Sequence, residues 1–101
     1  MYNKNNLAKL KKMDSVVPEA MKAFWAFDKA ALAEGAIPVK YKELIAVAVA
    51  HTTQCPYCID IHNASPRKAG AADTEIVETA MVAAALRAGA TVTHATHTLS
   101  D

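Results

Sequence analysis

Two cysteines and a histidine are the residues of this sequence best suited to chemistry. Cys55 and Cys58 are two residues apart and are the chain's only cysteines, so neither has another partner within the chain. His62 follows Cys58 by four residues, which places both side chains on one helix face. Two thiols this close can form a disulfide, and an imidazole one turn away can take a proton from sulfur. The spacing therefore predicts thiol redox chemistry.

The start of the helix suggests which thiol reacts. Pro56 predicts that a helix begins at or just after Cys55, because proline is favoured at the first helical position. Both sulfurs then lie in the first turn, where the helix dipole favours a thiolate. Cys58 lies one turn from His62 and Cys55 lies two turns away. We therefore expect Cys58 to be the activated thiol and Cys55 the resolving thiol.

Glu43 is a further candidate because it directly precedes the apolar stretch 44–50. A carboxylate at the edge of a buried helix must be paired, hydrated or neutralised. The functional interpretation is that Glu43 orients His62 or accepts protons from it. Glu43 lies about 18 Å of helix rise before Cys55, so a tight hairpin at Cys55 would bring it nearer to His62 than to Cys58. Flanking lysines make a surface position at the helix start the alternative.

A zinc site is the main alternative for the cysteine pair. His51, Cys55, Cys58 and His62 have the composition of a Cys₂His₂ site. A structural zinc site normally takes its two ligand pairs from separate elements, whereas these residues surround a single junction between helices. We therefore expect no metal. His51 is expected to be bonded locally at a helix end, and the two histidines near the C-terminus are expected at the surface.

Composition predicts one helical domain over residues 1–101. Hydrophobic residues make up 52% of the chain but aromatic residues only 6%, so the core is thin and we expect an oligomer. The net charge of +1 indicates neither a nucleic acid nor a membrane partner, and an early lysine cluster is expected to be a solvated face. No secretory leader pattern occurs, and no apolar run reaches the roughly 18 residues of a membrane helix. A cytoplasmic location is the expectation.

The chain is expected to be all-α, with about five to six helices. No stretch alternates polar and apolar residues, so no strand is predicted. A partly helical N-terminal segment, about 1–16, precedes the first long helix. The predicted helices, with boundaries good to a few residues, are about 18–34, 38–53, 56–69, 73–88 and 91–99.

Packing expectations follow from the same patterns. Gly35, Gly70 and Gly89 each follow an alanine-rich stretch, so each is expected to end a helix in the left-handed conformation. The stretch 44–50 is apolar on every side, which predicts a central helix covered all round. An apolar stripe in the first long helix is expected to serve core or interface packing, and its members are Met21, Phe24, Trp25 and Phe27.

The stretch Lys42–Ala50 together with Glu43, the Cys55/Cys58 pair, His62 and Gly70 resembles the AhpD-like alkylhydroperoxidase branch of the carboxymuconolactone decarboxylase family. The resemblance covers about residues 38–88, which is most of the predicted core. It is more specific than a CxxC pair alone, because the same residue types recur in the same order and spacing. It implies a compact all-helical domain that assembles into homotrimers or homohexamers.

The resemblance also implies an activity. Cys58 attacks a hydroperoxide and becomes a sulfenic acid, and Cys55 condenses with it to a disulfide. His62 and Glu43 form the proton relay. The chain carries no flavin, nicotinamide or haem signature, so no cofactor is expected and turnover needs an external dithiol, either a lipoyl protein or a thioredoxin-like protein. The decarboxylase branch lacks the cysteine pair, which argues against decarboxylation.

Two departures from the family pattern affect the site. Tyr57 stands where some peroxidases of this type have histidine, so one proton carrier is missing. Pro66 cannot donate a hydrogen bond to the His62 carbonyl and should kink or restart the helix. Three alternatives to a peroxidase remain at this stage: a disulfide reductase with little peroxidase activity, a non-catalytic zinc-binding module, and a structural helical oligomer.

Overall fold

The computed structural model describes residues 2–62 and 64–101, and no strand occurs among them. The expected all-α class is therefore confirmed. The elements are η1 (Lys4–Lys9), α1 (Leu10–Val16), α2 (Pro18–Leu32), α3 (Val39–Thr52), α4 (Pro56–Ile61), α5 (Ser65–Lys68), α6 (Asp73–His94) and η2 (Ala95–Thr98).

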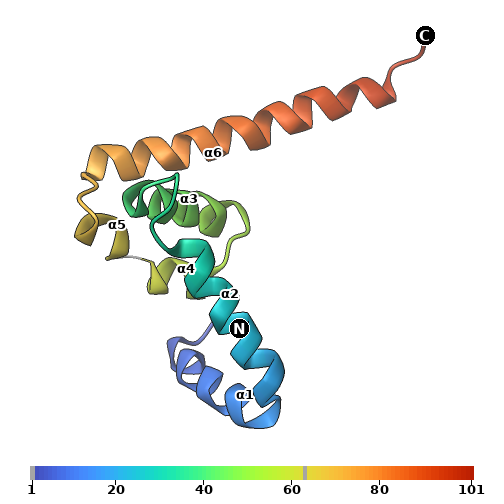
Figure 1. Cartoon of the computed structure of the whole chain (residues 1–101). Helices are drawn as coiled ribbons and strands as arrows, with labels where there is room; N and C mark the ends of the chain where they lie inside the picture. The colour runs from blue at the N-terminus through green and yellow to red at the C-terminus, as the bar shows by residue number, and fades with distance from the viewer. Residues whose placement is uncertain (1, 63) are drawn as a thin grey trace.

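Helix α3 is the centre of the fold (Figure 1). It packs most extensively on the first half of α6 and also contacts α2, α4 and α5. Its buried face carries Leu44, Val47 and Ala50, and Met21 of α2 and Ala71 complete the small apolar core. The core is thus built mainly from one face of the helix that leads into the cysteine pair.

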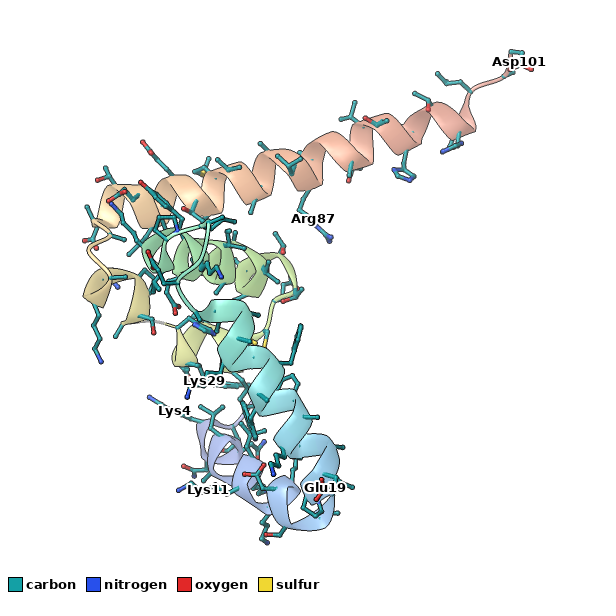
Figure 2. The ribbon with its side chains drawn as sticks, viewed as in Figure 1. Lys4, Lys11, Glu19, Lys29, Arg87 and Asp101 are labelled. Atoms are coloured by element: carbon teal, nitrogen blue, oxygen red, sulfur yellow. The ribbon has the colours of Figure 1, made fainter. Side chains whose placement is uncertain are left out.

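The two ends of the chain extend from this core in different directions (Figure 1). η1 continues directly into α1, and this helical segment lies beside α2; Lys4 and Lys11 project outward from it, as expected for a solvated basic face (Figure 2). At the other end the C-terminal half of α6, which includes Arg87, projects beyond the body (Figure 2). The radius of gyration is 17.1 Å, against about 13 Å for a compact chain of this length.

The expectation that the stretch 44–50 is covered all round is wrong for the single chain. Ile45 and Val49 are 50% and 53% exposed. They line an open apolar groove between α3 and α6, which Val82 and Leu86 border from the other side. The reason is that α4, α5 and α6 together cover only part of the surface of α3.

The glycines behave differently from one another. Gly70 ends α5 with a positive φ of 98°, as predicted. The prediction for Gly89 is wrong, because α6 continues through it to His94. A glycine inside a helix costs only about 1 kcal/mol relative to alanine, and the alanine-rich neighbours sustain the helix. Gly35 lies in the bend between α2 and α3 without a positive φ.

The predicted helix 56–69 is two helices. α4 ends at Ile61, and α5 begins at Ser65 with Pro66 in its first turn. The expectation that Pro66 restarts the helix is therefore confirmed. Its ring is fully buried, so it also helps to seal the core beside α3.

The stretch Asp73–Thr98, which joins α6 and η2, is long and apolar enough to cross a membrane by length and composition, with a mean hydropathy of 1.3. It meets this average without an uninterrupted apolar run. None of its most apolar part is buried inside the chain. Helices that pack against a protein partner can have a similarly apolar composition.

Candidate active site

The turn between α3 and α4 sets the position of the cysteine pair. α3 ends in a Schellman motif, in which Cys55 N–H donates to the Ala50 carbonyl at 3.0 Å and Gln54 N–H donates to the His51 carbonyl at 3.3 Å. The motif requires a left-handed residue, and Gln54 takes this role with a φ of 54°. Cys55 then becomes the N-cap of α4, and Pro56 is its first residue.

The two thiols are close together, half-buried and reduced. Cys58 N–H donates to Cys55 Sγ at 3.2 Å, so the sulfur caps the helix as an Asp or Ser side chain commonly does. The pKa of the Cys55 thiol is lowered, first by the hydrogen bond from the Cys58 thiol and then by this backbone N–H. The pKa of the Cys58 thiol is raised, first by its hydrogen bond to Cys55 and then by burial.

This order of acidity differs from the sequence-based expectation that Cys58 is the more acidic thiol. The main cause is the hydrogen bond from the Cys58 thiol to the Cys55 sulfur, and the N–H group that the helix N-terminus directs at Cys55 Sγ acts in the same direction. Proximity to His62 had suggested the reverse. In the reduced pair Cys55 is thus the thiol better suited to hold a negative charge, and Cys58 the one that keeps its proton.

Glu43 and His62 meet within one chain. His62 Nδ1 lies 3.0 Å from Glu43 Oε2, and the two side chains are 21% and 13% exposed. The flanking lysines point elsewhere: Lys40 pairs with Glu75 at 2.8 Å, and Lys42 Nζ donates to the Ala31 carbonyl at 2.9 Å. The surface alternative for Glu43 is therefore wrong. With Nδ1 donating to the carboxylate, Nε2 of His62 remains available to exchange a proton.

A pocket of about 460 Å³ is lined by both Cys58 and His62. Its walls come from η1, α1, α2 and α4, and the lining residues are Asn6, Leu7, Leu10, Phe24, Trp25, Asp28, Tyr57, Cys58, Ile61 and His62. Cys55 is not part of the lining. A small molecule in this cavity therefore meets Cys58 first, with the imidazole in the same wall.

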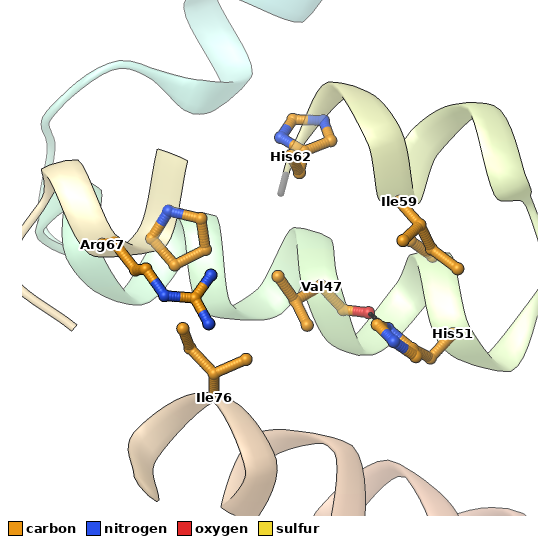
Figure 3. Close-up of a pocket in the computed structure, with 8 residues that line it drawn as sticks. Val47, His51, Ile59, His62, Arg67 and Ile76 are labelled. Carbon is orange, nitrogen blue, oxygen red and sulfur yellow. Dashed lines mark hydrogen bonds between the residues drawn. The ribbon is translucent and has the colours of Figure 1, made fainter. Parts of the chain in front are cut away.

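A second pocket, of about 150 Å³, also includes His62 in its lining, together with residues of α3, α4, α5 and α6. Figure 3 shows Val47, His51 and Ile76 around it, with His62 at its edge. His51 Nδ1 lies 2.8 Å from the Val47 carbonyl, which confirms that this histidine is bonded locally. His62 is thus common to the lining of the thiol pocket and of this smaller pocket.

The zinc alternative has no geometric support within the chain. Among residues 2–62 and 64–101, no three His, Cys, Asp or Glu side chains converge on a point where a metal could bind. His51, one of the four candidate ligands, uses its Nδ1 for the bond to Val47.

Several residues of the site were not identified from the sequence. Phe24 and Trp25 were assigned to packing, yet they are 50% and 38% exposed and line the thiol cavity. Tyr57 was regarded as the loss of a histidine, yet its hydroxyl accepts a hydrogen bond from Asn6 Nδ2 at 3.0 Å. Its place between the cysteines was a usable signal, but Asn6, 51 positions earlier, gave none.

Comparisons with known proteins agree with this architecture. The sequence model of the carboxymuconolactone decarboxylase family matches residues 18–101. A crystal structure of a carboxymuconolactone decarboxylase family protein from Legionella pneumophila superposes with a TM-score of 0.76 and 37% identity, covering 82% of this chain and 74% of that one.

Two curated relatives are also similar. An uncharacterized protein encoded in the cox locus of Paracoccus denitrificans is 49% identical over 78 residues, which is 77% of this chain and 70% of that protein. An alkyl hydroperoxide reductase from Mycobacterium tuberculosis is 40% identical over 52 residues, which is 52% of this chain but only 15% of that protein. The resemblance drawn from the residues is confirmed: this chain belongs to the carboxymuconolactone decarboxylase family, with the cysteine pair of its AhpD-like branch.

Proposed function

We propose that the chain is a thiol-dependent peroxidase that reduces hydroperoxides through Cys58 and Cys55, with His62 and Glu43 as the proton relay. The observation that carries the proposal is that Cys58 and His62 line one cavity while His62 is bonded to Glu43 at 3.0 Å. A nucleophile, a proton carrier and a group that orients the carrier are thus assembled in one chain. The similarity to an alkyl hydroperoxide reductase supports the same activity.

The first step forms a sulfenic acid. Cys58 passes its proton to His62 and attacks the terminal oxygen of the hydroperoxide, and the O–O bond breaks. The departing alkoxide takes this proton from His62 and leaves as the alcohol. Glu43 holds the imidazole in place through the 3.0 Å hydrogen bond to Nδ1.

The second step forms the disulfide. The Cys55 thiolate attacks the Cys58 sulfur, and the sulfenic oxygen takes a proton and leaves as water. The Cys58 N–H at Cys55 Sγ favours the ionisation of this thiol, and the proton that Cys55 loses is the one that the leaving oxygen takes. Overall the dithiol gives two electrons, and the hydroperoxide becomes one alcohol and one water. An external dithiol, a lipoyl protein or a thioredoxin-like protein, then reduces the disulfide.

A dithiol–disulfide oxidoreductase is the second candidate. The lowered pKa of Cys55 favours it, because the thiolate is the attacking species in disulfide exchange. In that reaction Cys55, and not Cys58, would react first. The two candidates therefore differ in which cysteine reacts first.

Single-cysteine variants distinguish the candidates. Each variant receives one equivalent of cumene hydroperoxide and then dimedone, and the adduct is located by mass spectrometry. The peroxidase proposal predicts that Cys55→Ser accumulates a sulfenic acid at Cys58 and that Cys58→Ser forms none, while the unmodified protein loses two thiols. Equal trapping in both variants would overturn the assigned roles. No thiol loss with peroxide, but rapid reduction of a disulfide substrate, would support the second candidate.

We further propose that the chain assembles into a homotrimer or homohexamer through the groove between α3 and α6. Its apolar residues Ile45, Val49, Val82 and Leu86 are all at least half exposed in the single chain. An exposed patch of this kind typically marks a protein interface or a membrane contact. Sedimentation velocity should give three or six chains per particle, and Val82→Lys should lower that number. Partition of the protein into lipid vesicles would instead assign α6 to a membrane.

A further inference from the structure

Tyr57 connects the cysteine motif to the beginning of the chain. Its hydroxyl accepts hydrogen bonds from Asn6 Nδ2 at 3.0 Å and from Asn3 N–H at 3.3 Å. Its ring also meets the ring of Tyr2 edge to face, with centroids 4.8 Å apart. Three contacts therefore attach residues 2–10, hereafter the N-terminal segment, to the first turn of α4.

The N-terminal segment closes one side of the thiol cavity. Leu7 and Leu10 share the pocket lining with Phe24 and Trp25 of α2, and Ile61 of α4 adds to this apolar surface. A volume of about 460 Å³ equals roughly fifteen water molecules of about 30 Å³ each. Hydrogen peroxide, with two heavy atoms, fills little of this space. A hydroperoxide with an alkyl or aryl body can fill it while its O–O group lies at Cys58.

We propose that Tyr57 is a positioning residue that holds the N-terminal segment against α4, and that this segment forms the wall of a pocket selective for hydroperoxides with an apolar body over hydrogen peroxide. The inference rests on the proposed peroxidase function for its reaction. The pocket itself depends only on the contacts of Tyr57 and on the apolar lining.

Burial of apolar surface in the pocket favours the binding of only one of the two substrate classes. An alkyl or aryl body gains affinity by leaving water for the leucine and aromatic side chains, whereas hydrogen peroxide has no apolar surface to bury. Weakening the attachment of the segment should thus raise KM for a bulky hydroperoxide. The chemistry at Cys58 and His62 uses other atoms, so kcat should not change in step with KM.

Tyr57→Phe tests the positioning role. The variant keeps the ring that meets Tyr2 and removes the oxygen that accepts from Asn6 and Asn3. The loss of two neutral hydrogen bonds weakens the attachment of the segment, so KM for cumene hydroperoxide should rise roughly tenfold with little change in kcat. The ratio of kcat/KM for cumene hydroperoxide to that for hydrogen peroxide should fall by the same factor.

Two further variants serve as a control and as a direct test of the wall. Tyr41→Phe is the matched control, because Tyr41 lies half-exposed on α3 and the same change should leave the substrate ratio as it was. Leu10→Ala shortens the wall directly and should lower the ratio about tenfold or more, as expected when an apolar pocket loses several methyl or methylene contacts. An unchanged ratio in both Tyr57→Phe and Leu10→Ala would overturn the inference. So would a loss in kcat alone.

A binding measurement separates the pocket from the reaction. Trp25 is the only tryptophan of the chain and lines the cavity, so its fluorescence reports on occupancy. Titration with 2-phenyl-2-propanol, the alcohol formed from cumene hydroperoxide, should give a saturable change. Tyr57→Phe should weaken that binding roughly tenfold, since the same wall is loosened.

The outcomes are distinct. Saturable alcohol binding in a protein that consumes no peroxide would refute the peroxidase function and keep the pocket. Peroxide consumption without saturable alcohol binding would refute the pocket and keep the function.

Discussion

The contribution of the Glu43–His62 hydrogen bond to the free energy of unfolding can be measured. His62 Nδ1 and Glu43 Oε2 are 3.0 Å apart, and both side chains are mostly shielded from solvent. A hydrogen bond that involves a charged group contributes about 1.5–3 kcal/mol to folding. Glu43→Ala removes the acceptor and leaves the imidazole N–H without it. We expect a loss of about 2 kcal/mol in the free energy of unfolding.

Glu43→Gln is the conservative comparison. Its side-chain carbonyl can still accept from Nδ1, so the variant keeps a neutral hydrogen bond and should lose about 1 kcal/mol less than Glu43→Ala. Urea unfolding at a fixed chain concentration measures both, because assembly would otherwise change the apparent stability. A loss of about 2 kcal/mol lowers the urea midpoint by roughly 1–2 M for a chain of this size.

A double-mutant cycle with His62→Ala then isolates the pair. The coupling energy between Glu43→Ala and His62→Ala should exceed about 1 kcal/mol, whereas independent sites add within about 0.5 kcal/mol. Additive effects would show that the bond does not form in solution, and the relay would lose its basis. His62→Ala should also slow peroxide reduction by about 10²–10⁴-fold, the usual contribution of a general acid or base.

The thiol order and the two left-handed residues give further predictions. Since the pKa of Cys55 is lowered and that of Cys58 raised, iodoacetamide should label Cys55 from a lower pH than Cys58. Cys58→Ala should move the pH profile of Cys55 labelling to higher pH. Peptide mapping measures the labelling of each cysteine. Gly70→Ala should cost about 1–2 kcal/mol in urea unfolding, because φ is 98° while the space around the new Cβ is open. Gln54→Gly should stabilise the protein by up to about 1 kcal/mol, because glycine adopts its φ of 54° without strain; a loss of stability would contradict the Schellman description of this turn.

Features determined by nearby residues could be predicted from the sequence. The starts of α2 and α4 follow from Pro18 and Pro56, and the restart at α5 follows from Pro66. The meeting of Glu43 and His62 was expected from the family resemblance and not from spacing, which indicated only that Glu43 lies nearer to His62 than to Cys58; the structure forms the contact within one chain. The three helix starts depend mainly on residues that are close to them in the sequence.

Features that depend on side-chain geometry or on the surrounding residues could not be predicted. The acidity order of the thiols depends on which sulfur accepts the hydrogen bonds from the other thiol and from the helix N-terminus, and spacing alone did not show that Cys55 takes this place. Exposure of Ile45 and Val49 depends on how much of α3 the other helices cover. Gly89 lies inside α6 because its neighbours sustain the helix, so the residue type alone was misleading.

The chain divides its proposed work between two parts of the sequence. Both thiols, His62 and Glu43 lie inside the region that matches the family, which begins at residue 18. The wall formed by residues 2–10 lies outside it, and the contacts of Tyr57 join the two parts. A change in the N-terminal segment can therefore alter which peroxide reaches Cys58 without moving any group that handles a proton. Selectivity and reaction chemistry should accordingly respond to different mutations, which is the pattern that the substrate ratio measures.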